Sequence, residues 1–271
     1  MDSADIEEVH GRLSRPGYGT LTPDELAFVQ RAVTSEAPDR VIEIGTGAGL
    51  TAGIIAGLLA KTGGTSVTSI DAGTRFFAAP DLAIGHLAAQ VYSGDAVRID
   101  IRTGTRSIDL TGTDGPWQLA VIDADHAHPW PILDTMALWP HLTGNRTVLH
   151  HNLQQFRRNR PGLGIGPRVL FNEVPEAHRH ASPAGGWNIF AVDLRMRQRM
   201  FEEVALNALS IPWTVRPPLE AEVLDQFRSV MKPHFSDGFW REFDECVGLN
   251  RWSRAKRLYF AARRGAAGLR R

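Results

Sequence analysis

The sequence predicts an α/β fold, with a doubly wound, mostly parallel sheet, helices on both of its faces and a helical extension at the C-terminus. Short apolar segments of strand length alternate with helical segments up to about residue 152, an order that is typical of parallel strands joined by crossover helices. A glycine-rich turn separates the first of these strands from the helix after it. Residues 195–247 then carry helical patterns without a strand between them.

Capping residues and hydrophobic spacing predict the first elements. Thr22, followed by Pro23 and by apolar residues at helical spacing, predicts a helix before the sheet. Residues 40–44 form an apolar run of strand length, and the small apolar residues 50–59 predict the next helix. Residues 66–71 predict a second strand, which completes a β-α-β unit.

The later elements follow from the same patterns and predict a Rossmann-like sheet of at least five strands. We expect strands over 96–101, 118–122, 146–149 and 187–193, and helices over 79–90, 130–139, 195–209, 218–230 and 237–247. Residues 1–195 are predicted to form one domain, with residues 196–271 as an extension packed on it. Within this domain, residues 153–186 are rich in Arg, Asn, Pro and Gly, which predicts an irregular, lid-like loop.

The composition excludes several classes of protein. Hydrophobic residues make up 43% and charged residues 22% of the 271 residues, as in ordinary globular proteins. Lys and Arg number 30, and so do Asp and Glu, so we expect neither a nucleic acid nor a membrane as partner. The acidic N-terminus lacks the pattern of a signal peptide and favours a cytoplasmic location. The single Cys246 excludes an internal disulfide and a multi-cysteine zinc site.

The glycine-rich turn is the first candidate binding site. Gly45, Gly47 and Gly49 follow a G-x-G-x-G pattern and, with Thr46, are expected to let a ligand approach the backbone closely. A dinucleotide fingerprint needs its third glycine one position later, where this chain has Leu50. The pattern therefore disfavours a nicotinamide cofactor.

Two acidic residues indicate what kind of ligand the turn binds. Glu43 precedes the glycines at the end of the first strand, where its charge favours a cationic group and repels a pyrophosphate. Asp71 ends the second strand, where acids accept hydrogen bonds from ribose hydroxyls. The pair predicts a nucleoside that carries a positive charge. The alternative is a glycine turn that only packs a helix, beside two solvated acids.

The segment from Glu43 to Gly49 resembles the first motif of class I methyltransferases that use S-adenosylmethionine (SAM), and Asp71 resembles their ribose-binding acid. The resemblance covers residues 21–152 and implies that SAM is the cofactor, bound by the domain over residues 1–195. In this family the loop after the third strand contacts the adenine, which implies a contact near Gly104 and Thr105.

A second cluster, Asp123-Ala-Asp-His126, follows the fourth strand. It resembles the Asp-x-x-His segment of metal-dependent O-methyltransferases that act on sugars, polyketides and catechols. The resemblance implies that Asp123, at the wall of the cofactor pocket, binds a divalent ion or orients the acceptor and that His126 is the general base. The alternative is that Asp125, His126 and His128 only cap the following helix.

The end of the fifth strand departs from that group. His150-His151-Asn152 stands where the relatives usually present two acids or Asp-Asn. Asp123, His151 and Asn152 would still offer ligands to a divalent ion, although magnesium prefers oxygen ligands. The sequence leaves open a metal-free enzyme that uses His126 or His151 as its base.

We therefore expect an enzyme that transfers the methyl group of SAM to a hydroxyl of a small molecule, such as a sugar or a natural-product intermediate. A hydroxyl is a poor nucleophile until its proton is removed, which gives the base its task. Methylation of nitrogen is an alternative, although the Asn/Asp-Pro-Pro-Tyr tetrapeptide of many such enzymes is missing. A non-catalytic protein with this fold is the other alternative. The sequence does not exclude a homo-oligomer.

Overall fold

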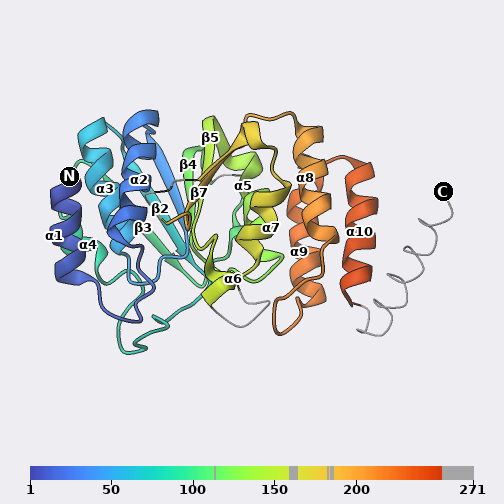
Figure 1. Cartoon of the computed structure of the whole chain (residues 1–271), viewed down its shortest axis with the longest axis horizontal. Helices are drawn as coiled ribbons and strands as arrows, with labels where there is room; N and C mark the ends of the chain where they lie inside the picture. The colour runs from blue at the N-terminus through green and yellow to red at the C-terminus, as the bar shows by residue number, and fades with distance from the viewer. Residues whose placement is uncertain (113, 159–163, 182, 184–185, 252–271) are drawn as a thin grey trace.

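The computed structural model describes residues 1–112, 114–158, 164–181, 183 and 186–251, and it contains a seven-stranded sheet (Figure 1). The strand order is β3-β2-β1-β4-β5-β7-β6. Strands β1 to β5 are parallel, whereas β7 is antiparallel to both of its neighbours. The strands are β1 (Arg40–Ile44), β2 (Ser66–Asp71), β3 (Arg98–Thr103), β4 (Trp117–Ile122), β5 (Leu142–His150), β6 (Arg179–Ala181) and β7 (Phe190–Asp193).

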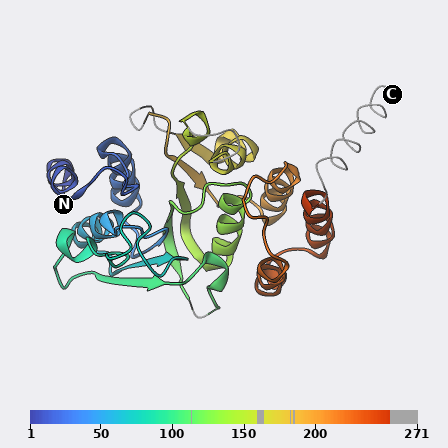
Figure 2. The same ribbon diagram turned by 90° about the horizontal axis from the view of Figure 1, so that it is seen from below.

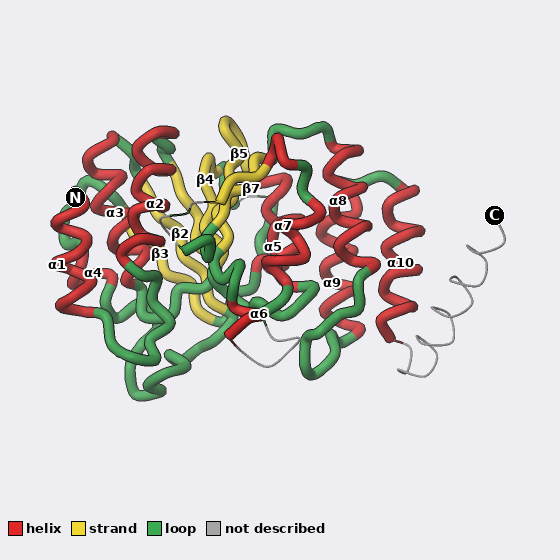
Figure 3. The backbone as a smooth tube through the Cα atoms, in the orientation of Figure 1, coloured by secondary structure: helices red, strands yellow, loops and turns green. Residues whose placement is uncertain are grey.

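Helices cover the sheet on both faces (Figures 2 and 3). The helices are α1 (Ser3–Leu13), α2 (Pro23–Glu36), α3 (Leu50–Thr62), α4 (Ala88–Val91), α5 (Trp130–Leu138), α6 (Gln155–Arg158), α7 (Gly166–Glu173), α8 (Gln198–Ser210), α9 (Ala221–Met231) and α10 (Asp237–Arg251). No helix of the described residues has the length and apolar character needed to cross a bilayer.

Alternation along the strands divides the core into two layers. In β1, Val41 packs into the layer formed with α1 to α3, whereas Ile42 and Ile44 pack into the layer formed with α5 and α7 to α10. Successive strand residues point to opposite faces, so an apolar strand of this kind supplies both layers. Helices α8, α9 and α10 thus share one apolar core with α5 and the sheet. The domain boundary at residue 195 stays a prediction.

The α/β fold, the doubly wound sheet and the C-terminal helices are confirmed. The helix predicted over 79–90 is wrong except at its end, because Pro80 and Gly85, the latter with a φ of 76°, interrupt helical geometry and leave only α4. The segment 153–186 is also not one irregular loop, since it contains α6, α7 and β6. Its residues 159–163, 182 and 184–185 lie outside the described residues, as do residues 252–271 of the extension.

Candidate active site

A cavity of about 550 Å³ opens at the carboxyl ends of the parallel strands. It brings together most of the residues predicted from the sequence: Gly45, Thr46, Gly47, Gly49, Asp71, Thr105, Asp123, His126 and Asn152. Glu43, Gly104 and His151 were expected in the site but do not line the cavity. The volume is within the range of small-molecule pockets.

Backbone crowding explains the glycines of the turn. Gly45 has a φ of 97°, and a Cβ atom there would lie 2.2 Å from the backbone oxygen of Asp123. Gly49 has a φ of 86°, and a Cβ atom there would lie 2.6 Å from the Cα of Gly85. The turn therefore sits against two other loops, and a side chain at either position would push them apart.

Asp71 connects this turn to the loop after β3. Its Oδ2 accepts a hydrogen bond from the backbone N–H of Gly47 at 3.0 Å, and its Oδ1 accepts one from Gly73 at 2.8 Å. The backbone N–H of Thr105 donates to the Asp71 carbonyl at 2.9 Å, and that of Gly104 donates to Gly73 at 2.8 Å. Gly104 thus braces the loop, whereas Thr105 reaches the cavity wall.

Glu43 lies beneath the cavity and not at its surface. Ser69 Oγ donates a hydrogen bond to the Glu43 carboxyl at 2.5 Å, and the Ser69 and Thr46 hydroxyls lie 2.7 Å apart. Burial raises the pKa of Glu43 to about 8. The interaction of Glu43 with a ligand cation, directly or through water, stays a prediction; in the structure its link to the cavity runs through Ser69 and Thr46.

His151 lies between two carboxylates. Its Nδ1 is 2.7 Å from Asp123 Oδ1, and its Nε2 is 3.1 Å from Glu25 Oε1 in α2. Burial by itself would lower the pKa of His151, but the two acids outweigh this and raise the pKa to about 10. Burial likewise opposes ionisation of Glu25, yet His151 and Asn188 bring the pKa of Glu25 down to about 2. His151 is therefore a buried imidazolium that donates from both ring nitrogens.

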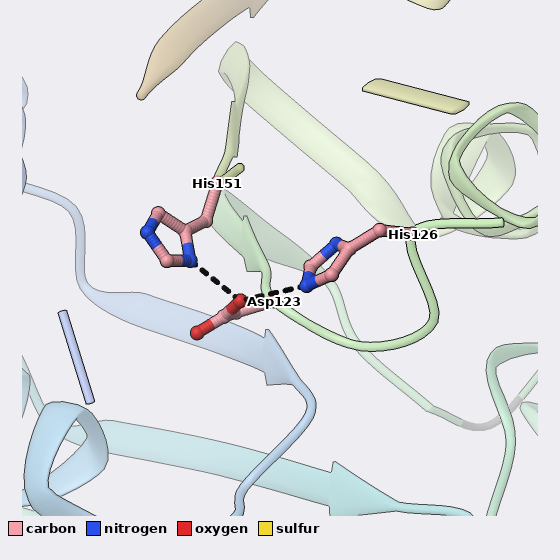
Figure 4. Close-up of side chains that lie close together, drawn as sticks. All are labelled: Asp123, His126 and His151. Atoms are coloured by element: carbon pink, nitrogen blue, oxygen red, sulfur yellow. Dashed lines mark hydrogen bonds and ion pairs between the residues drawn. The ribbon is translucent and has the colours of Figure 1, made fainter. Parts of the chain in front are cut away.

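His126 is different, because its ring reaches the cavity. Its Nε2 lies 2.8 Å from the side-chain nitrogen of Asn152 and 3.5 Å from Asp123 Oδ1 (Figure 4). Burial lowers the pKa of His126 even though Asp123 acts in the opposite direction. The ring is therefore neutral at pH 7 and offers an unprotonated nitrogen to a ligand.

The donor atoms do not fit the predicted metal site. One possible ligand atom from each of Asp123, His126 and His151 lies within 4.8 Å of the others. A metal ligand must have a free lone pair, however, and both nitrogens of His151 carry protons directed at acids. The Asn152 amide lies on His126 instead. The metal site of Asp123, His151 and Asn152 and the role of His151 as a base stay predictions, and the pairing of His151 with two carboxylates favours neither.

The neighbours of His126 do not cap the following helix, since the N-terminus of α5 receives no side-chain capping hydrogen bond; they bond within the loop before it and to Thr214. Asp125 Oδ1 accepts a hydrogen bond from the backbone N–H of Ala127 at 2.8 Å. His128 is buried, and burial lowers its pKa to about 4. Its backbone N–H donates to Thr214. Asp125 and His128 therefore stabilise the loop before α5, and only His126 of the predicted capping group presents its ring to the cavity.

The sequence interpretation missed several residues of the site. Glu25 forms a capping box with Thr22 at the start of α2, and nothing in that pattern indicates a contact with His151. Asn188 donates to Glu25 at 2.6 Å from a position 163 residues away in the chain. Tyr18 and Phe77 line the cavity from two loops, and Phe77 is 68% exposed. An exposed aromatic residue has no recognisable signal in a single sequence.

Part of the chain is similar to a known protein family. Residues 42–153 match the model of a family described as a methyltransferase domain. No curated protein sequence matches the chain. Solved structures of similar fold include an O-methyltransferase from Bacillus cereus in complex with S-adenosylhomocysteine (SAH), at 18% identity and a TM-score of 0.49, covering 71% of this chain and 92% of that chain.

Two further structures resemble the chain to a similar degree. The O-methyltransferase TomG from Streptomyces achromogenes, in complex with SAM, has 14% identity and a TM-score of 0.49, covering 70% of this chain and 88% of that chain. A tRNA (m1A58) methyltransferase from Aquifex aeolicus has 15% identity and a TM-score of 0.46, covering 70% and 76%. Likenesses this distant do not define an acceptor. The family match covers the central part of the chain, since residues 42–153 are similar to a methyltransferase domain.

Proposed function

We propose that the protein transfers the methyl group of SAM to a hydroxyl group of a small molecule. One observation carries the proposal: a single cavity joins the glycine turn and Asp71 to the neutral ring of His126. The first two features suit the nucleoside and amino-acid parts of SAM, and the third suits the removal of a proton. A cavity of about 550 Å³ is of the size of small-molecule sites and favours a small acceptor.

The binding of SAM would use the backbone of the turn. Asp71 faces the cavity and suits the ribose hydroxyls, which would donate hydrogen bonds to its carboxylate beside or in place of the one that it now accepts from Gly47. Helix α3 begins at Leu50, beside the cavity, and its first backbone N–H groups suit the carboxylate of the methionine part. The Thr46 hydroxyl, backed by Ser69 and Glu43, offers a further polar contact.

His126 would act as the general base. As the acceptor oxygen attacks the methyl carbon, its proton passes to Nε2 of His126. The bond between carbon and sulfur breaks, its electron pair stays on sulfur, and SAH leaves. The acceptor hydroxyl would take the place of the Asn152 amide, which now lies 2.8 Å from Nε2. The Asp123 carboxylate, 3.5 Å away, stabilises the imidazolium that forms.

The experiment compares His126→Ala with a matched control, His234→Ala, whose side chain is exposed near α9. SAH binding is measured by calorimetry, and turnover is measured as SAH formed from SAM with a panel of catechols, sugars and primary amines. We expect His126→Ala to bind SAH with a Kd within about twofold of the parent and to lose activity about 10²- to 10⁴-fold. Full turnover in His126→Ala would show that His126 is not the general base. Turnover with amines alone would show that the acceptor group is not a hydroxyl.

A further inference from the structure

A buried amide side chain, Asn188, lies just before β7 and joins three segments beside the cavity. It is 6% exposed. Its Oδ1 accepts a hydrogen bond from the backbone N–H of Gln154 at 2.9 Å, and its Nδ2 donates one to Glu25 Oε1 at 2.6 Å. A backbone N–H can only donate, and an ionised carboxylate can only accept. These two partners therefore fix which end of the Asn188 amide is oxygen and which is nitrogen.

The orientation of Asn188 determines that of Asn152. Asn188 Nδ2 also donates to Asn152 Oδ1, at 3.4 Å. If the Asn152 amide were turned over, its own nitrogen would face this donor. The nitrogen of Asn152 consequently lies at the other end of the amide, 2.8 Å from His126 Nε2. Because an amide nitrogen donates, Nε2 accepts this hydrogen bond, and the neutral ring of His126 carries its proton on Nδ1.

Asn152 and His126 form one wall of the cavity. A ligand group that enters between them meets the lone pair of Nε2 on one side and the N–H group of Asn152 on the other. Asn152 has a left-handed backbone, with a φ of 66°. This conformation is uncommon outside glycine, although asparagine is enriched in it, and such positions occur often at functional sites. The site thus offers a hydrogen-bond acceptor beside a hydrogen-bond donor.

We propose that Asn152, oriented by Asn188, donates a hydrogen bond to the oxygen of the methyl acceptor and makes the site selective for hydroxyl over amino groups. The inference rests on the proposed function. A hydroxyl group has one proton and two lone pairs. The proton passes to Nε2 of His126, and one lone pair accepts from Asn152. The other lone pair forms the bond to the methyl carbon, while the bond between carbon and sulfur breaks and leaves its electron pair on sulfur.

An amino group does not satisfy the same wall. A neutral amine has a single lone pair, and that pair must form the bond to the methyl carbon. One of its N–H groups can donate to Nε2 of His126, but the N–H group of Asn152 then has no lone pair to bond to. A donor that is shielded from water and left without a partner opposes binding. A site built to pair with a hydroxyl therefore discriminates against the amine.

The test compares the methylation of catechol with that of ortho-phenylenediamine, which has the same shape and is uncharged near neutral pH. The readout is the ratio of kcat/KM for the hydroxyl compound to kcat/KM for the amine, followed as SAH formed from SAM. If another hydroxyl compound of the panel is the better substrate, it replaces catechol, together with its amino analogue. Binding of SAH and the Tm are measured beside the ratio, to show that each variant is folded.

The variants remove the donor in two ways. Asn152→Gly and Asn152→Asp both tolerate the left-handed backbone. Asn152→Gly should lower the ratio at least about tenfold, because the amine no longer leaves a donor unpaired. Asn152→Asp should lower it further, since a carboxylate accepts from an amine. Asn188→Ala frees the Asn152 amide to turn and should lower the ratio by a smaller factor. The control, Asn207→Asp, is exposed on α8 and should keep the ratio of the parent.

A second measurement does not depend on the methyl acceptor. Nitrogen NMR spectroscopy of the SAH complex, with the His126 signals assigned by their loss in His126→Ala, shows which ring nitrogen carries the proton. We expect the proton on Nδ1 in the parent and a larger share of it on Nε2 in Asn152→Gly and Asn188→Ala. If Asn188 had only a structural role, its loss would lower the Tm and leave the ratio and the proton position unchanged.

The outcomes separate the inference from the proposed function. A proton on Nε2 in the parent, or an unchanged ratio in a folded Asn152→Gly variant, would overturn the inference and leave the proposed function intact. A parent protein that methylates no member of the panel would overturn the proposed function and the inference with it.

Discussion

The contact between Glu25 and His151 gives the sharpest test of the site. Substituting Gln for Glu25 preserves the size of the side chain and removes its charge. The Glu25 carboxylate now accepts hydrogen bonds from the Thr22 backbone at 2.7 Å, from Asn188 at 2.6 Å and from His151 at 3.1 Å. A glutamine oxygen can still accept from Asn188 and His151, but its NH₂ group would then face the Thr22 N–H, which is also a donor.

The expected loss of stability follows from these contacts. The lost bond to Thr22 is a helix-capping interaction worth about 1 kcal/mol. Removing one partner of a buried ion pair costs about 3–5 kcal/mol, and the retained hydrogen bond to His151 reduces this to about 2 kcal/mol. The sum of about 3 kcal/mol should lower the Tm by about 6–12 °C in a protein of this size. Asp24→Asn, an exposed change in the same helical turn, should cost about 0.5 kcal/mol.

The dependence on pH identifies the ion pair as the cause. The pKa of Glu25 falls from 4.5 to about 2 on folding. Its contribution to the free energy of unfolding is therefore fully present above pH 4.5 and is lost as the pH falls toward 2. The pKa of His151 rises from 6.5 to about 10 on folding. Its contribution to the free energy of unfolding is therefore fully present below pH 6.5 and is lost as the pH rises toward 10. The difference in free energy of unfolding between the parent and Glu25→Gln should therefore be largest between pH 4.5 and 6.5.

The assay is thermal and urea unfolding followed by circular dichroism from pH 3 to pH 9. The parent, Glu25→Gln and Asp24→Asn are compared at each pH. Two results would show that Glu25 does not keep His151 protonated. One is a Glu25→Gln variant that is no less stable than Asp24→Asn, and the other is a loss of stability in Glu25→Gln that does not change with pH.

Two further predictions concern the metal and the glycine turn. Dialysis against a chelator should leave turnover unchanged, because both nitrogens of His151 are occupied by carboxylates; activity that disappears and returns with added magnesium would contradict this. Gly45→Ala should weaken SAH binding at least about tenfold, because a methyl group there would lie 2.2 Å from a backbone oxygen. Its control is Gly11→Ala in α1, where nothing lies within 4 Å and stability should rise by about 0.5–1 kcal/mol; equal SAH affinity in both variants would contradict the tight packing of the turn.

The fold and the glycine turn were predictable because their signals are local. The spacing of Gly45, Gly47 and Gly49 and the position of Asp71 at a strand end depend on short stretches of chain. The order of strands and helices then placed Asp123 and His126 at the same edge of the sheet.

The correct role of His151 was not predictable, because it depends on contacts between distant segments. His151 stands beside Asn152 in the sequence and looks like one more ligand. Its protonated state arises from Asp123 and from Glu25, which α2 brings against it, and Glu25 by itself reads as a capping residue. The contact between Ser107 and Asp134 has the same origin, since the two residues meet only after α5 has packed beside the end of β3.

The position of Glu25 also couples the N-terminus to the chemistry of the protein. Helix α2 precedes the whole sheet in the chain, yet its first turn completes the charge balance at the end of β5. If α2 separates from the sheet, Asp123 is the remaining counter-ion of His151. Asp123 then interacts more strongly with His151 and less strongly with His126. We therefore expect partial unfolding of the N-terminal helices to lower the proposed activity even when the cavity is otherwise intact.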